Sequence, residues 1–163
     1  MQLVRSLSYF HSPEYEALRS SGRSIGLTIG NFDGIHLGHQ LLFRELNAAL
    51  LSCRHMTEQK DTSPFKILMT FWPHPRQFLS GVSRRDLKTH EEYFVLTPLR
   101  KKLELVRAAG FDCFCLLRFE KRFASLSPEQ FLKDYLEDGI RPAVVVVGDD
   151  WAFGRGRSGK TGW

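Results

Sequence analysis

The chain has 163 residues, of which 42% are hydrophobic and 25% charged, a composition typical of one globular domain with a substantial core. Its net charge of +5 favours polyanionic ligands and would equally suit nucleic acid. No apolar stretch approaches the length of a membrane span, the N-terminus lacks a signal-peptide core, and the three cysteines form neither a metal-ligand spacing nor a disulfide framework, so we expect a cytoplasmic domain without a membrane partner.

Apolar runs typical of buried strands alternate along the chain with segments of helical periodicity. Strands are predicted at residues 27–30, 67–71, 111–117 and 143–147, and helices at residues 37–51, 97–109 and 128–136. Ser127 fits the N-cap of the last helix, Pro128 fits its first position, and Gly110 ends the helix before it. The alternation predicts an α/β fold with a doubly wound parallel sheet. Ligands of such sheets bind beyond the carboxyl ends of the strands.

Two polar segments separate these elements. Residues 53–64 are expected to form a loop that lengthens the first crossover, and residues 81–93 are charged and expected to be mobile. The sequence contains no internal repeat and no low-complexity tract.

Residues 30–39 (GNFDGIHLGH) join the first predicted strand directly to the first predicted helix. A strand, a glycine-rich turn and a helix in immediate succession aim backbone N–H groups and the positive end of a helix dipole at one place, where phosphate commonly binds. His36 and His39 share a face of the first helical turn, so both imidazoles are expected to point at an anion. Each feature alone is more typical of a tight turn or a helix cap, and only their coincidence predicts a site of phosphate chemistry.

Residues 30–39 resemble the signature of the nucleotidyltransferase superfamily, whose H-x-G-H motif is matched by residues 36–39. The Gly-Asn-Phe-Asp-Gly lead-in resembles the FMN adenylyltransferase module of bacterial bifunctional riboflavin kinase/FAD synthetases. Three further stretches agree with that module in order and spacing: residues 70–76 (TFWPHPR), 96–105 (LTPLRKKLEL) and 147–154 (VGDDWAFG, with Trp for the usual Phe). The resemblance extends from about residue 4 to residue 159 and implies one Rossmann-like nucleotidyltransferase domain over residues 1–163.

The resemblance implies transfer of the adenylyl group of ATP to the phosphate of FMN, forming FAD and pyrophosphate. Catalysis would rest on His36, His39 and Asn31, because imidazoles with pKa values near neutrality become protonated beside bound phosphates. The residues that it places at ATP are Gly30, Phe32, Asp33, Gly34, Gly38, Asp150 and Arg157. Those that it places at the flavin are Pro73, His74, Pro75 and Arg76, with Arg76 near the FMN phosphate. No carboxylate cluster indicates a metal site, so Mg²⁺ is expected to arrive with ATP.

Some of these residues also have simpler readings. Asp33 fits a residue that only stabilises the turn, and residues 73–76 fit a rigid edge turn with an exposed arginine. Residues 154–161 match the P-loop pattern G-x-x-x-x-G-K-[ST]. A P-loop requires a strand directly before it and a helix directly after it, and neither is predicted there. We therefore predict a basic glycine-rich loop, in which Arg157 and Gly159 match an R-x-G element of the resembled family.

That family continues beyond the R-x-G element with another strand, a Ser/Thr-rich S-S/T-x-x-R segment and a riboflavin kinase domain, none of which is found in these 163 residues. The domain is therefore expected to be truncated at its C-terminus and to leave one sheet edge unpaired. Two readings stay open: an FMN adenylyltransferase and a non-catalytic nucleotide- or flavin-binding module. A nucleotidyltransferase with another acceptor is disfavoured by residues 73–76. ATP and FMN are the expected partners; nucleic acid is not, since only net charge favours it.

Overall fold

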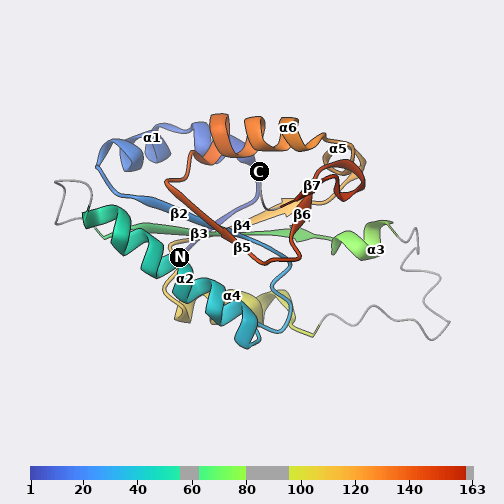
Figure 1. Ribbon diagram of the computed structural model, residues 1–163, viewed down its shortest axis with the longest axis horizontal. Coiled ribbons are helices and arrows are strands. Elements are labelled where there is room, and N and C mark those ends of the chain that lie inside the picture. The colour runs from blue at the N-terminus through green and yellow to red at the C-terminus, as the bar shows by residue number, and fades with distance from the viewer. Residues whose placement is uncertain (56–62, 80–95, 161–163) are drawn as a thin grey trace.

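The computed structural model describes residues 1–55, 63–79 and 96–160. At their centre lies a five-stranded sheet in the order β1-β4-β3-β2-β5, in which all neighbouring strands are parallel. The strands are β1 (Gln2–Val4), β2 (Ile25–Ile29), β3 (Phe65–Trp72), β4 (Cys113–Arg118) and β5 (Val144–Val147). Helices cover both faces of the sheet (Figure 1), which confirms the predicted doubly wound α/β fold.

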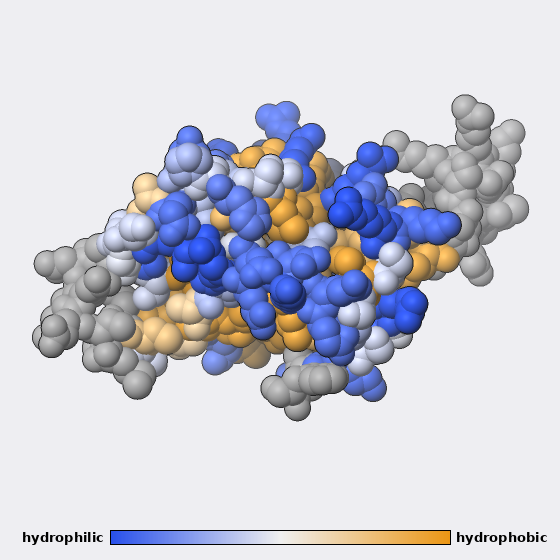
Figure 2. Space-filling view, turned by 90° about the horizontal axis from the view of Figure 1, so that it is seen from above, coloured by the Kyte–Doolittle hydropathy of each residue, from blue (hydrophilic) through white to orange (hydrophobic). Residues whose placement is uncertain are grey.

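The helices form one layer on each face of the sheet (Figure 1). One layer contains α2 (Leu37–His55) and α4 (Leu99–Ala108), and the other contains η1 (Leu7–His11), α1 (Pro13–Ser20), α6 (Pro128–Phe131) and the π-helical segment η2 (Leu132–Ile140). Two short helices, α3 (Pro75–Leu79) and α5 (Lys121–Ala124), follow β3 and β4. Seen from above, onto α1 and α6, the surface is mainly hydrophilic, with hydrophobic residues between and beneath (Figure 2).

Two clusters of buried side chains hold the layers together. Successive residues of β3 point to opposite faces of the sheet, so Ile67 and Met69 join the cluster under α1 and η2, while Leu68 joins the cluster under α2 and α4. Leu46 and Leu50 lie one turn apart on α2 and are both fully buried. This spacing is what gives the α2 sequence its helical periodicity.

The order of the strands determines where a ligand would bind. β2 lies between β3 and β5, with Gly26 opposite Val144 and Ile29 opposite Val147. After β2 the chain therefore forms the neighbouring strand β3 on one side of β2, and it forms β5, the neighbour on the other side, only later. The loops after Ile29 and Val147 emerge side by side at the carboxyl end of the sheet. Open α/β sheets bind their ligands at such a switch point.

β5 is an edge strand of this sheet, and Val145 in its middle is 40% exposed. Edge strands are present in any open sheet, so the expected truncation of the domain stays a prediction. Within residues 1–55, 63–79 and 96–160, no helix has both the length and the apolar character needed to cross a membrane.

The predicted elements are present, with several corrections at their ends. Residues 53–55 extend α2, so the expected loop begins later than residue 53, and its residues 56–62 lie outside the described ranges, as do residues 81–93. Residues 73–76 are not entirely loop, because Pro75 begins α3; proline suits this position, whose N–H would have no partner within the helix. Ser127 and Gln130 form a capping box at α6, as the predicted N-cap requires.

The sequence analysis missed β1, η1 and α1. Three residues are too few for β1 to show an alternating pattern, and η1 and α1 are short. Their signals lie in the caps instead, since the side chain of Ser6 accepts a hydrogen bond from the backbone of Ser8 and that of Ser12 accepts one from Tyr15. The last predicted helix also extends past its predicted end at residue 136, because the π-helical segment η2 continues to Ile140.

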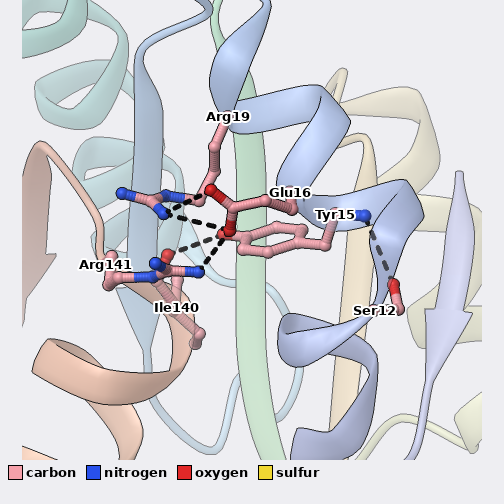
Figure 3. Close-up of polar contacts among 6 residues, drawn as sticks. All are labelled: Ser12, Tyr15, Glu16, Arg19, Ile140 and Arg141. Carbon is pink, nitrogen blue, oxygen red and sulfur yellow. Dashed lines mark hydrogen bonds and ion pairs between the residues drawn. The ribbon is translucent and has the colours of Figure 1, made fainter.

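A small polar cluster fastens α1 to the end of η2 (Figure 3). The fully buried Tyr15 hydroxyl donates a hydrogen bond to the carbonyl of Ile140 at 2.7 Å. Nearby, the Glu16 carboxylate accepts from Arg141 at 2.8 Å and from Arg19 at 3.3 Å. The Tyr15 bond is the buried one, and the Glu16 pairs are exposed.

Replacing Tyr15 by phenylalanine is expected to lower the free energy of unfolding by about 1–3 kcal/mol, because the buried Ile140 carbonyl loses its partner. Glu16→Gln should cost about 1 kcal/mol or less, since exposed ion pairs contribute little. Urea denaturation of both variants measures the difference. Equal effects of the two substitutions would show that the Tyr15 hydroxyl is not the important contact.

Candidate active site

The loops that follow β2 and β5 frame a cavity of about 1030 Å³. Residues from both loops line it, among them Gly30 and Asn31 after β2 and Asp149 and Asp150 after β5. The cavity extends along α2 as far as Ala49 and reaches α3 at Arg76 and Leu79. It therefore lies at the switch point of the sheet, where the sequence motifs were expected to converge.

His36 and His39 both line this cavity. Their rings are stacked, with centroids 3.7 Å apart and an angle of 21° between the planes. His36 precedes α2 and is exposed, whereas His39 lies in its first turn and is half-buried against the ring of Phe32, at 5.1 Å. A Cβ atom on Gly38 would lie only 3.1 Å from the His36 ring, so glycine permits this close approach. The pairing expected from the three-residue spacing is confirmed.

Burial lowers the pKa of His39 from 6.5 to about 4, and the neighbouring charges of His36 and Lys102 add to this, against smaller opposing effects of Asp33 and Asp150. The ligand-free imidazole is therefore neutral at pH 7, and the expected protonation of His39 beside bound phosphates stays a prediction. Its buried Nδ1 atom has no hydrogen-bond partner within the described protein. A neutral imidazole has one donor and one acceptor nitrogen, and because Nδ1 is buried, a ligand in this cavity would meet the other nitrogen, Nε2.

Because unfolded His39 takes up a proton near pH 6.5 and folded His39 only near pH 4, stability is fully present above pH 6.5 and should fall as the pH drops through this window. The lowered pKa of His74, caused first by burial, acts in the same direction. His39→Gln should flatten the pH dependence of urea midpoints between pH 7 and pH 4. His11→Gln, which changes an exposed side chain at the end of η1, is the control. Parallel curves for the two variants would contradict this assignment.

The loop that carries the two histidines is tied to the start of α4. Both carboxylate oxygens of Asp33 accept backbone hydrogen bonds, from Leu96 and Thr97, each at 2.9 Å. The Thr97 hydroxyl in turn accepts from the backbone N–H of Gly34 at 2.8 Å. Asp33 thus stabilises the turn, as its simpler reading proposed. Its contact with ATP stays a prediction.

The same loop contains strained backbone. Phe32 has φ +47° and Ile35 has φ +39°, values that side chains other than glycine rarely adopt, and Gly34 has φ +82°. The Phe32 ring is fully buried and packs on His39 and Phe43. Strain of this kind persists only where surrounding contacts hold it, and it is typical of ligand-binding loops.

Lys102 is a further residue near the histidines that the sequence analysis did not assign, although it does not line the cavity. It extends from α4 to the loop after β2, where its ammonium donates to the carbonyl of Asn31 at 2.8 Å, and burial lowers its pKa. Its position in the helix would have indicated this, because Lys102 follows Leu99 by three residues and precedes the buried Val106 by four. It therefore lies on the inward face of α4.

Two of the four residues expected at the flavin line the cavity, and Pro73 and His74 do not. Pro75 and Arg76 line it at the start of α3, and Arg76 is exposed. His74 is half-buried, with its Nδ1 accepting from the backbone N–H of Arg76 at 3.2 Å. Pro73, also half-buried, connects β3 to this turn. Phe71 and Phe119 line the neighbouring wall.

A hairpin closes the cavity beyond β5. Its strands β6 (Ala152–Phe153) and β7 (Gly159–Lys160) are antiparallel and joined through the 3₁₀ turn η3 (Arg155–Arg157). Arg157 donates to the carbonyl of Asp150 at 3.0 Å, and the rings of Trp151 and Phe153 stack at 4.6 Å. The part of the P-loop-like segment that the structure describes, residues 154–160, is thus a hairpin, which confirms that it does not open a helix.

The described residues contain no group of three His, Cys, Asp or Glu side chains able to hold a metal ion. Both oxygens of Asp33, a carboxylate near the histidines, already accept backbone hydrogen bonds. This donor set does not fit a protein-held Mg²⁺ ion.

Known proteins with similar sequences match most of this chain. Residues 19–162 match the FAD synthetase family. The "Bifunctional riboflavin kinase/FMN adenylyltransferase" of Escherichia coli K12 is 35% identical over 133 residues, which are 82% of this chain and 37% of the relative. The protein of the same name from Bacillus subtilis is 32% identical over 129 residues, 79% of this chain and 35% of the relative. The chain thus spans little more than a third of the length of these relatives.

A solved structure titled "Crystal Structure of Macrolide-efflux Protein from Streptococcus pneumoniae" has a similar fold. It superposes with a TM-score of 0.69 at 24% identity, covering 93% of this chain and 42% of the other. This likeness concerns the fold alone. The sequence match over residues 19–162 agrees with the cavity, which residues of three of the four motifs line. The chain belongs to the FAD synthetase family.

Proposed function

We propose that this domain transfers the adenylyl group of ATP to FMN, forming FAD and pyrophosphate. The observation that carries the proposal is that one cavity is lined both by a stacked histidine pair and by Arg76 with aromatic side chains. Its volume of about 1030 Å³ lies at the upper end of ordinary ligand pockets, which supports room for a nucleotide and a flavin together. Membership of the FAD synthetase family supports the same reaction.

In the proposed reaction an oxygen of the FMN phosphate attacks the α-phosphorus of ATP. The bond from this phosphorus to the oxygen bridging to the β-phosphate breaks, and pyrophosphate leaves. Charge on the transferring phosphoryl oxygens is stabilised mainly by positioned donors and cations. His36 and His39 are placed to hydrogen-bond these oxygens, and a bound phosphate would raise the pKa of His39.

The remaining predicted residues have supporting roles in this proposal. Gly30 and Gly38 keep the backbone close to the nucleotide, and Asn31 offers an exposed amide to its phosphates. Asp150 and Arg157 would contact the nucleoside part of ATP from the loop after β5. Mg²⁺ would enter bound to ATP, whose phosphate charge it neutralises.

In the proposed flavin subsite, Arg76 is a cation available to the FMN phosphate. Apolar surface for a flat ring system comes from Phe71, Phe119 and Trp151. Binding of FMN should therefore be stronger than binding of riboflavin, which lacks the phosphate. Titrations followed by flavin fluorescence, with and without MgATP, test this. Binding of both ligands without any FAD formation would instead leave the domain as the binding module that the sequence also allowed.

Arg76→Met is expected to raise the Kd of FMN about tenfold or more, because a charge-assisted hydrogen bond to phosphate contributes about 1.5–3 kcal/mol. The Kd of riboflavin should not change. Arg100→Met, on the exposed side of α4, is the matched control and should leave both values unchanged. Equal weakening of FMN and riboflavin by Arg76→Met would contradict a phosphate contact.

A further inference from the structure

The carbonyl oxygen of Asn31 is held from two directions by side chains of other elements. The Thr70 hydroxyl, on β3 and 1% exposed, donates to it at 3.2 Å. The Lys102 ammonium, on α4, donates to it at 2.8 Å. These two bonds connect the end of β2 to β3 on one side and to α4 on the other.

Fixing this carbonyl also fixes the peptide group that begins the histidine loop. The carbonyl and the N–H of a trans peptide point in opposite directions, so the N–H of Phe32 points away from Thr70 and Lys102. Phe32 itself has the disfavoured φ of +47°, and its buried ring packs on His39. The hold on Asn31 therefore opposes relaxation of a strained residue that touches the histidine pair.

Lys102 also brings positive charge close to two of the predicted site residues. After burial, its charge is one of the causes that lower the pKa of both His39 and His74, and Asp33 is its acidic neighbour. Lys101, the adjacent residue, differs in each respect: its side chain is 60% exposed and pairs with Glu104. The chain thus offers a matched control one position away.

We propose that Lys102 is a positioning residue of the active site. By holding the Asn31 carbonyl, it orients the loop after β2, which carries His36 and leads into the first turn of α2 with His39. Its role in turnover rests on the proposed adenylyl transfer. The orientation of the loop does not, and it can be measured in the ligand-free protein.

The first test is kinetic. Lys102→Met should lower kcat for FAD formation about 10–100-fold, with the KM for FMN changed less than about threefold, because misplacing reacting groups affects the transition state more than ground-state binding. Lys102→Arg, which keeps a cationic donor, should recover much of the loss, and Lys101→Met should behave as the parent. An equal effect of Lys101→Met would overturn the proposal.

The second test needs no turnover. In Lys102→Met the amide of Gly34, bonded to Thr97, should exchange with solvent at least about tenfold faster, while Gly26 in β2 keeps its protection. NMR titration should show the pKa values of His39 and His74 both rising. Unchanged exchange and titration would overturn the proposal. The expected changes in a protein that makes no FAD would refute the proposed function alone.

A fold defect in Lys102→Met would be recognised by its melting curve. Thr70→Val, which removes the other donor to the same carbonyl, then replaces it in both tests. Faster exchange at Gly34 with Gly26 unaffected would support the proposal, and no change would overturn it.

Discussion

His39→Ala is expected to reduce FAD formation about 10²–10³-fold, the usual loss when one preorganised donor to a developing oxyanion is removed. The expectation rests on the half-buried imidazole, which lines the cavity and whose ring centroid lies 3.7 Å from that of His36. FMN affinity should stay near that of the parent, because the contact with the FMN phosphate is assigned to Arg76 and not to His39.

Steady-state assays with saturating FMN and MgATP measure this effect, and fluorescence titration checks the binding of FMN. His11→Ala, which removes an exposed side chain at the end of η1, should leave both measurements unchanged. A His39→Ala protein that keeps more than about a tenth of the parent rate would remove this imidazole from the chemistry.

Asp33→Ala is expected to lower the free energy of unfolding by about 2 kcal/mol and the rate of FAD formation at least about tenfold. Both carboxylate oxygens accept backbone hydrogen bonds, from Leu96 and Thr97, and their loss frees the histidine loop from α4. Asp33→Asn keeps one acceptor oxygen and should cost about half as much stability.

Urea denaturation and steady-state kinetics on the two variants separate the two readings of this residue. Asp138→Ala, an exposed carboxylate on η2, serves as the control. A loss of ATP affinity without any loss of stability would mean that Asp33 contacts the nucleotide and does not stabilise the turn.

Local sequence was sufficient for the parts of the fold that depend on neighbouring residues. The apolar runs indicated the four longer strands, and the spacing of Leu46 and Leu50 indicated α2. The parallel direction of the strands follows from the rule that strands linked by helices run parallel, whereas their order was not predicted. The convergence of the motifs at one edge of the sheet therefore required no knowledge of side-chain contacts.

The details of the site could not be predicted in this way, because they depend on contacts between distant residues. Asp33 meets Leu96, and Lys102 meets Asn31, only after α4 packs on the sheet. The lowered pKa of His39 depends first on burial, which a motif does not report. Spacing could place two histidines on one face, but the stacking of their rings required the conformation of the whole loop.

The central claim is that this domain joins the adenylyl group of ATP to FMN within the cavity framed by the loops that follow β2 and β5. The most direct test incubates the purified 163-residue chain with FMN, ATP and Mg²⁺ and separates the flavins by HPLC. We expect FAD in molar excess over the protein. The His39→Ala variant should form FAD only at its strongly reduced rate. A folded chain that binds FMN and ATP yet forms no FAD would contradict the claim.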